Sequence, residues 1–550
     1  MELIDQHTKK IMEGCKERAR AAGLCFQDET LEYIVTNRDL LELSPKVMIP
    51  TLYDYWVHDV EVLKEKGRYE LYPGNPYETV INTRPPISFY NDNNPDWLNV
   101  MIFYHVLGHI DFFQNNLFFR HTWDFDFSGE ALSDKRLIAG YRAEKGRWVD
   151  YVIEFARGMD NLVGYFDELG KRDEIPGTRF SRRLDFYFDV FLQRIKNVKA
   201  TGYVKEIERY NECIRQYNKL GEQSFFADVV KTYPEFETIY ARSLGKKISS
   251  KLDPMQFVME YSEFLNKDEN KWMKSVMQVV RNTSMFFQPQ IRTKIMNEGW
   301  SSYWHEKLFL EDDRIKGHEV DFARVNSGVT SLPRVGLNPY ALGMRLFYYL
   351  EEMANKGKYS YDFQKLHSSN EREKYDANTG EGKRFIFDVR ENLSDFMFIN
   401  TFVDQAFVTR NDLFVAGKRL NQDKMVWEYY VKSRNAAAYR QMLLESLYHP
   451  AHIEVDVEKS SSPVLYLVHH FEGKPLVRDF IQNTMMGIEF LWGGPVQLET
   501  SEALVTRSYP GHPLYGAALG KVLDSEKKIK LTWQRVLYTM ENRKLGKKNI

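Results

Sequence analysis

A long apolar segment of the chain reads Ile102-Phe103-Tyr104-His105-Val106-Leu107-Gly108-His109-Ile110-Asp111-Phe112-Phe113, and the expected fold is built around it. Its histidines stand four residues apart inside an apolar run, so on a helix both imidazoles leave one face about a turn apart. That spacing lets two imidazoles bind one ion. A helix start at Asn94-Pro95-Asp96 predicts a helix from Asp96 to about Phe119. Gly108, on the same stripe, predicts that another backbone approaches closely.

A second stretch lies far along the chain and reads Ile295-Met296-Asn297-Glu298-Gly299-Trp300-Ser301-Ser302-Tyr303-Trp304-His305. Glu298 and His305 are seven residues apart, which is close to two helical turns and puts both side chains on one face. Facing helices would then bring imidazoles and a carboxylate to one point, the usual ligand set for a divalent metal. The predicted ligands are His105, His109 and Glu298, with His305 as a further one, and zinc is the expected ion.

A plainer interpretation makes His105 and His109 core histidines and Glu298 a buried carboxylate with ordinary partners. For the histidine pair alone that interpretation is favoured, because the spacing arises often by accident. The second stretch favours the metal site over this plainer interpretation. Glu298 is followed by Gly, Trp, Tyr and Trp, and burying a carboxylate among them without a partner would cost several kcal/mol.

Composition limits the classes of protein. The chain has 550 residues, more than one hydrophobic core usually serves, so two or more domains are expected. Its 75 basic and 77 acidic residues give a net charge of -2, which argues against a nucleic-acid partner. The three cysteines form no disulfide framework. Neither a signal peptide nor a membrane span is predicted, and a cytoplasmic protein is expected.

The expected fold class is α+β, with a large, mainly helical domain over residues 1–390 and a smaller C-terminal α+β domain over residues 391–550. In the helical part, helices are predicted over residues 31–43 and 52–66, with a turn at 73–76. A loop or lid is predicted over residues 122–145. The stretch Gly336-Leu337-Asn338-Pro339-Tyr340 indicates a helix start, with Asn at the N-cap and Pro at the first helical position.

A helix start also presents free amide groups to an anion. Arg292, Asn338 and Tyr340 are predicted to bind a substrate carboxylate or a developing oxyanion. For Asn338 the purely structural role, starting a helix, is the favoured interpretation.

The C-terminal part predicts short strands with two helices between and after them. The predicted strands cover residues 413–416, 425–431, 452–457, 464–468 and 495–499, and the helices 436–448 and 476–491. We expect one sheet covered by both helices on one face. Its open edge would bind a partner chain, or the sheet would dock on the helical domain. His469 and His470 are interpreted as surface residues, and residues 519–550 as a fraying end.

Three blocks of sequence resemble the signature blocks of the SpoVR family, stage V sporulation protein R and its relatives. They are the stretch from His105 to Asn116, the stretch from Met296 to His305, and the stretch from Gly336 to Gly343. They fall in the same order at comparable positions, and the likeness covers about residues 5–390. Residues 122–145 and 199–251 match none of the blocks.

The resemblance implies a cytosolic bacterial protein associated with maturation of the spore cortex or cell envelope. It also implies two partners, an AAA-type serine protein kinase and a von Willebrand A-like protein. The substrate it suggests is a peptidoglycan peptide or precursor.

Two classes of function remain open. One is a metal-dependent hydrolase or acyl-transferase acting on an amide bond, and the other is a regulatory scaffold with a structural metal. In zincin peptidases a glutamate follows the first histidine as general base, but here that residue is Val106. The acids near the blocks that could act as a catalytic base are Glu298 and Asp111. Three protein ligands would leave a position for water or substrate, whereas four would close the site.

Overall fold

The computed structural model describes most of the chain. The described residues are 2–27, 29–36, 78–123, 127–164, 182–196, 198, 200–217, 220–245, 252–421, 426–447, 450–460, 463–471, 474–505 and 531–550. The helix predicted over residues 52–66 and the turn at 73–76 lie outside these ranges. So do residues 37–43 of the helix predicted from Leu31.

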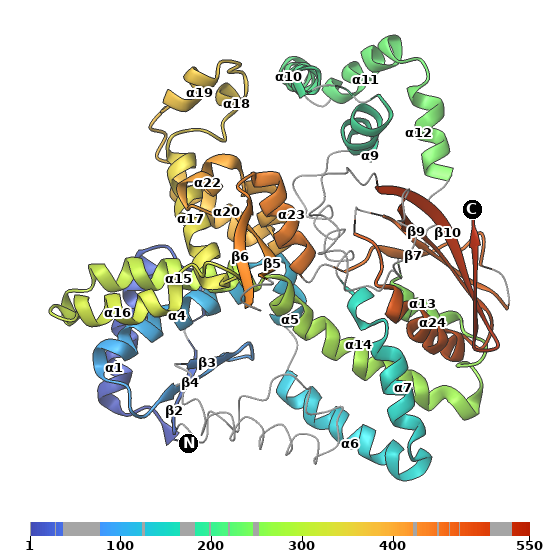
Figure 1. The fold of residues 1–550 in the computed structure, drawn as a ribbon, viewed down its shortest axis with the longest axis horizontal. Helices are drawn as coiled ribbons and strands as arrows, with labels where there is room; N and C mark the ends of the chain where they lie inside the picture. The colour runs from blue at the N-terminus through green and yellow to red at the C-terminus, as the bar shows by residue number, and fades with distance from the viewer. Residues whose placement is uncertain are drawn as a thin grey trace.

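The helix predicted from Asp96 is the centre of the fold. It is α4 (Asp96–Asn115), and every residue from Leu98 to Phe113 is buried. A helix that is apolar all round needs neighbours on every side. α1 (Gln6–Ala21), α15 (Lys294–Glu311) and α20 (Gly382–Asn392) supply them, and α15 packs in turn on α17 (Pro339–Asn355). Figure 1 shows α4 and α15 side by side, with α1 and α16 (Glu319–Thr330) beside them.

Glycines let these helices meet at backbone distance. A Cβ on Gly108 would lie 2.7 Å from the Cα of Ser301, so α4 and α15 touch there without a side chain between them. A Cβ on Gly299 would overlap the backbone of Gly343, which brings α15 and α17 equally close. The close approach predicted from Gly108 is confirmed.

One large buried cluster surrounds these three helices. It takes in Met12 of α1 and Trp300 of α15 and continues to Leu443 of α23. The other helices that contribute to it are α16 (Glu319–Thr330), α21 (Asp395–Phe402), α22 (Gln405–Arg410) and α23 (Ala436–Ser446). Two short helices, α18 (Tyr361–Gln364) and α19 (Ser369–Lys374), follow α17.

A small sheet lies near the N-terminal side of α4. Its order is β1-β2-β4-β3, and its strands are β1 (Glu2–Leu3), β2 (Leu31–Val35), β4 (Ile87–Asn91) and β3 (Glu78–Ile81). β2 and β4 run parallel, while the other neighbours are antiparallel. Residues 31–35 are thus a strand, and the prediction of a helix there is wrong. Their β-branched and aromatic side chains pair with β4, a partner that local periodicity does not reveal.

A second buried cluster joins helices from the middle of the chain to a C-terminal sheet. The helices are α6 (Phe127–Lys145), α7 (Trp148–Arg157), α13 (Pro254–Tyr261), α14 (Lys271–Arg292) and α24 (Arg478–Trp492). α14 runs from this cluster towards α15, as Figure 1 shows, so it connects the two clusters.

The C-terminal strands form two sheets instead of the single sheet that was predicted. β5 (Val415–Asn421) and β6 (Val426–Ser433) form a two-stranded ribbon, and β5 contacts α23 of the first cluster. The second sheet has the order β11-β10-β9-β8-β7 and belongs to the second cluster. Its strands are β7 (Ile453–Val455), β8 (Leu465–His469), β9 (Val496–Val505), β10 (Leu531–Glu541) and β11 (Lys544–Asn549).

Three more predictions need correction. Residues 127–145 are α6, not a loop, and Ile138 is buried in the second cluster. Much of the end predicted to fray is β10 and β11, and the alternation of β10 buries Val536, Tyr538 and Met540. His469 is buried and contacts Thr500, whereas His470 is exposed as predicted.

The α+β class is confirmed, while the domain boundary at residue 390 stays a prediction. The first cluster continues past residue 390 to Leu443, and the second joins α7 and α14 to strands beyond residue 453. A third, aromatic cluster is formed by α9 (Arg182–Asp185), the π-helical segment Phe186–Ile195, α10 (Ala200–Tyr217), α11 (Gly221–Thr232) and α12 (Phe236–Gly245). Within the described ranges, each helix is too short or too polar to cross a membrane.

We predict that Gly299→Ala destabilises the protein, because its Cβ would push α15 and α17 apart. Overpacking of this kind costs roughly 1–3 kcal/mol, and the thermal unfolding midpoint should fall by several degrees. Gly140→Ala is the matched control. It lies in α6 with no atom within 4 Å of the added Cβ, so it should leave the midpoint unchanged or raise it slightly. Equal midpoints for Gly299→Ala and the unsubstituted chain would contradict the prediction.

Candidate metal centre

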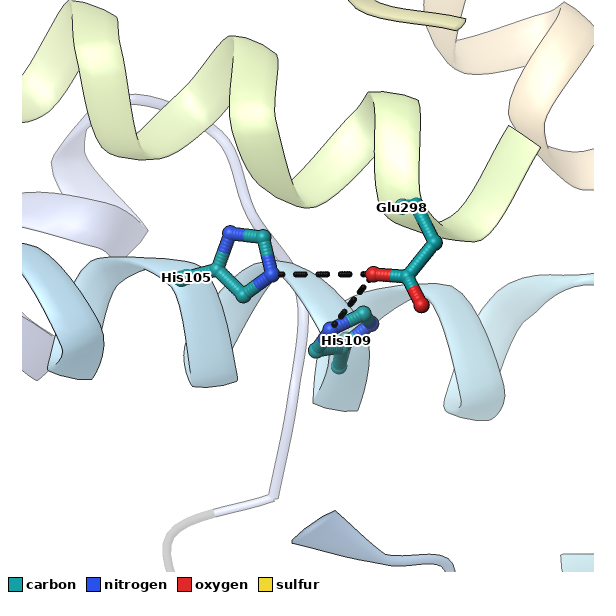
Figure 2. Close-up of side chains that lie close together, drawn as sticks. All are labelled: His105, His109 and Glu298. Atoms are coloured by element: carbon teal, nitrogen blue, oxygen red, sulfur yellow. Dashed lines mark ion pairs between the residues drawn. The ribbon is translucent and has the colours of Figure 1, made fainter. Parts of the chain in front are cut away.

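Two helices bring three potential metal ligands to one point. His105 and His109 project from one face of α4, and Glu298 projects from α15 towards both (Figure 2). One carboxylate oxygen of Glu298, Oε2, lies 3.8 Å from His105 Nε2 and 3.5 Å from His109 Nε2. The ligand atoms of the three residues all lie within 4.8 Å of one another.

These separations fit an ion between the three groups. Zinc binds imidazole nitrogen and carboxylate oxygen at about 2.0–2.1 Å, so two ligand atoms of a tetrahedral site lie about 3.4 Å apart. The two distances in the structure, 3.5 and 3.8 Å, are close to that value and longer than a normal charged hydrogen bond. The chemistry fits as well, because two imidazoles and a carboxylate are ordinary ligands of zinc and its first-row neighbours.

A hydrogen bond from the α15 side sets the tautomer of His109. The Nδ1 of His109 lies 2.9 Å from the side-chain oxygen of Asn297. That oxygen only accepts, so Nδ1 carries the proton and donates it. The Nε2 of a neutral His109 therefore presents its lone pair on the side of Glu298. An outer hydrogen bond of this kind is the usual way to orient a metal-binding imidazole.

A longer chain of hydrogen bonds sets the tautomer of His105. Asn326 Nδ2 donates to the Glu306 carboxylate at 2.6 Å, which turns Asn326 Oδ1 towards His305 Nε2, 2.9 Å away. His305 then donates from Nε2 and accepts at Nδ1, where His105 Nδ1 lies at 2.8 Å. His105 must donate, so the lone pair of a neutral His105 is on Nε2, facing Glu298.

In this arrangement His305 therefore orients His105, one of the predicted ligands. Both of its ring nitrogens contact groups other than Glu298, and it does not belong to the three-residue group. Burial lowers the pKa of His305 to about 3, so its ring is neutral. Seven residues of helix rise about 10.5 Å, which explains why Glu298 and His305 do not reach the same point. Its assignment as a ligand stays a prediction.

Glu298 is ionised in this setting. Burial raises the pKa of its carboxyl, but contacts with His105 and His109 and a hydrogen bond from Tyr340 outweigh burial and hold the pKa below its usual value. Tyr340 also stacks on His105, with ring centroids 5.9 Å apart. Of the three residues predicted to bind substrate, Tyr340 is the one that the structure brings to the metal group.

Asp111 lies two residues beyond His109, which turns it to another face of α4. Its Oδ1 accepts from the backbone of Cys25 at 2.7 Å, and its Oδ2 accepts from the Trp300 indole at 2.8 Å. Arg390 Nε lies 3.3 Å from Oδ2. These contacts give Asp111 a role in packing, and its role as a catalytic base stays a prediction.

The other two predicted substrate-binding residues make structural contacts. Arg292 ends α14 and donates to the carbonyl of Asn161 at 3.0 Å. Asn338 is the N-cap of α17, as its sequence context predicted, and also donates to the carbonyl of Val329 at 2.7 Å. Substrate binding by either residue stays a prediction.

Sequence reasoning missed the residues that orient the imidazoles. Asn297 stands next to Glu298, so its position on the same helix was a signal that could have been used. Asn326 and Glu306 lie on α16 and α15, and no spacing in the sequence connects them with His105. Their role depends on how the helices pack.

Comparison with known protein families shows to which family this chain belongs. A family profile described as "SpoVR like protein" matches residues 3–451, a segment that holds every residue of the metal group. The chain belongs to the SpoVR-like protein family. The resemblance read from the three sequence blocks is thereby confirmed.

The family has a relative among curated proteins, the "Uncharacterized protein YcgB" of Escherichia coli (strain K12). This SpoVR-like chain is 23% identical to it over 490 residues, which cover 85% of this chain and 86% of that protein. No solved structure matches the chain.

We predict that the purified SpoVR-like protein carries about one divalent first-row metal ion in the buried group. Elemental analysis should find this ion, and a His109→Ala, Glu298→Ala double variant should lose it, because only one of the three ligands then remains. A native protein purified without a bound ion, and unable to take one up, would refute the metal centre.

We also predict that Asn326→Leu weakens metal binding without removing a ligand. The variant keeps the branched shape of the side chain but no longer fixes the proton of His305, and loss of such an outer partner typically costs 10- to 100-fold in affinity. Ser327→Ala is the control, since Ser327 is exposed on the same helix and bonds only to the carbonyl of Arg324 in the described structure. Competition with a coloured chelator measures the metal affinity of both variants. Equal affinities would show that the hydrogen-bond chain does not tune metal binding.

Proposed function

We propose that this SpoVR-like protein is a cytosolic, metal-dependent enzyme that hydrolyses an amide bond or transfers its acyl group. The observation that supports this most is the convergence of three ligand atoms, from His105, His109 and Glu298. Three protein ligands leave a coordination position for water or substrate, which is the pattern of catalytic rather than structural zinc.

In the proposed reaction, the ion and the protein side chains have different roles. A divalent metal bound here would polarise a carbonyl group and lower the pKa of a bound water. Glu298 and the two oriented imidazoles hold that ion. Tyr340 is half-buried at the edge of the group and hydrogen-bonded to Glu298, and its hydroxyl proton would turn from Glu298 to an oxyanion that develops there. Val106 stands where a zincin has its glutamate, so the proton of the attacking water must pass to another group.

The proposed substrate is a peptidoglycan peptide or precursor. Membership of the SpoVR-like family supports this choice, because the family resemblance implies a role in spore cortex or cell-envelope maturation. Tyr340 is the described side chain at the site that would meet the peptide first.

A second function is supported by the burial of the site. The two histidines are 5% exposed, and the Glu298 side chain is 16% exposed, so a large substrate has little access while the helices keep this packing. In this alternative the metal is structural, and the protein is a regulatory scaffold for an AAA-type serine protein kinase and a von Willebrand A-like protein.

The two functions predict different results for Glu298→Gln. This variant keeps the shape of the side chain and removes the charge that holds the ion. If the protein is an enzyme, cells carrying Glu298→Gln should accumulate uncleaved or unexchanged muropeptides, as measured by chromatography of digested cell wall. Purified wild-type protein should convert the accumulating species, and the variant should do so at least about 100-fold more slowly, the scale of losing one electrostatic catalytic contact.

Glu311→Gln is the control, because Glu311 is an exposed acid at the end of the same helix. It should behave like wild type in both assays. Identical muropeptide profiles for Glu298→Gln and wild type, at equal protein levels, would reject the enzyme in favour of the scaffold.

A further inference from the structure

A second cluster of metal-binding side chains lies on the C-terminal sheet, away from α4 and α15. It consists of His452, Glu454 and His470, whose ligand atoms also lie within 4.8 Å of one another. These residues follow the segment 3–451 that the family profile matches, so family membership assigns nothing to them.

The ladder of β7 and β8 explains why the three side chains meet. In this antiparallel pair Ile453 is opposite His469, so the next position pairs His452 with His470, and His470 N–H donates to His452 C=O at 2.8 Å. Glu454 is two residues from His452 and shares its face, since side chains alternate along a strand. Val455 and Leu467 are buried in the second cluster.

The three side chains are already in contact with one another, as the ligands of one metal ion would be. His452 Nε2 lies 2.9 Å from one oxygen of Glu454, and His470 Nε2 lies 3.0 Å from the other. The two imidazole rings have centroids 4.6 Å apart. Hydrogen bonds from both histidines, set against partial burial, hold the pKa of the Glu454 carboxyl well below its usual value, so Glu454 is a carboxylate.

We propose that His452, Glu454 and His470 form a second binding site for a divalent first-row cation such as zinc. Two imidazole nitrogens and a carboxylate are suitable ligands for these ions. On binding, the ion takes the place of the Nε2 protons that now bridge the imidazoles to Glu454, and these protons pass to water. The side chains are partly exposed, so this site exchanges its ion more readily than the buried group on α4 and α15.

The position of the site indicates what the ion does. β7 is the edge strand of the five-stranded sheet and has only three residues. An ion held by His452 and Glu454 from the β7 side and His470 from the β8 side joins the two strands through their side chains. It therefore stabilises the pairing of a short edge strand, which the backbone ladder alone holds weakly.

Zinc titration of the full-length chain tests the proposal. With the buried group loaded, wild type should take up one further zinc ion per chain, measured by competition with a coloured chelator. Glu454→Gln and His470→Ala should each weaken this step at least roughly tenfold, because even outer partners of a metal site are worth that much. The same step should persist in the His109→Ala, Glu298→Ala double variant, which separates this site from the buried one.

His7→Ala is the matched control. His7 is an exposed histidine paired with one carboxylate, Asp96, at 3.0 Å, and its loss should leave the titration unchanged. Hydrogen exchange gives a second readout that ordinary surface binding would not produce. Zinc should slow exchange of the amides in β7 and at His470 in wild type and in His7→Ala, but not in His470→Ala.

Two results would overturn the proposal. One is a titration in which Glu454→Gln and His470→Ala bind zinc with the affinity and stoichiometry of wild type. The other is zinc uptake that leaves the exchange of the β7 and His470 amides as it was.

Discussion

The close packing of α4, α15 and α17 is the constraint on which the rest of the structure depends. The backbones of α4 and α15 are in contact where Gly108 faces Ser301, and those of α15 and α17 where Gly299 faces Gly343. Contact at this distance leaves no room for sliding or rotation of the helices, because interiors packed to this density resist displacement. Glu298 stands next to Gly299 and His109 next to Gly108, so the contacts that fix the helices also fix the ligand atoms.

The N-terminus of α15 is held in place by α21. Asp395 of α21 accepts hydrogen bonds from the backbone N–H groups of Ile295 and Met296, each at 2.8 Å. Burial raises the pKa of Asp395 to about 7, against the lowering effect of these two bonds. A buried carboxyl at this place is tolerated because the helix N-terminus offers donors that have no partner within the helix.

The arrangement of His105, His109 and Glu298 also depends on polar contacts with residues farther from the candidate site. Asn297 orients His109 from the next position on α15, whereas His105 is oriented through His305, Asn326 and Glu306. Tyr348 of α17 closes the second chain, since its hydroxyl donates to Glu306 at 2.9 Å. Three packed helices and α16 thus decide which nitrogen of each imidazole carries a proton. This extended support is the arrangement expected where both imidazoles must stay neutral and aimed at one point.

Several features could be predicted from the sequence because they depend on local spacing. The helix from Asp96, the shared face of His105 and His109, the close approach at Gly108, and the start of α17 at Asn338 are each set within a few residues. The three blocks were also enough to indicate the family. Periodicity identifies such features because a helix repeats every 3.6 residues whatever surrounds it.

Only the tertiary structure decided which residues on those faces meet. His305 shares a face with Glu298, but it packs behind His105, while Asp111 sits against Trp300 and Arg390. The strands after residue 413 divide between two sheets. β2 forms where a helix was predicted, and β10 and β11 form where a fraying end was predicted. Strand pairing and side-chain contact join residues up to hundreds of positions apart, and their geometry follows from the crossing of whole elements. Spacing along one element says which way a side chain points, but not what stands opposite it.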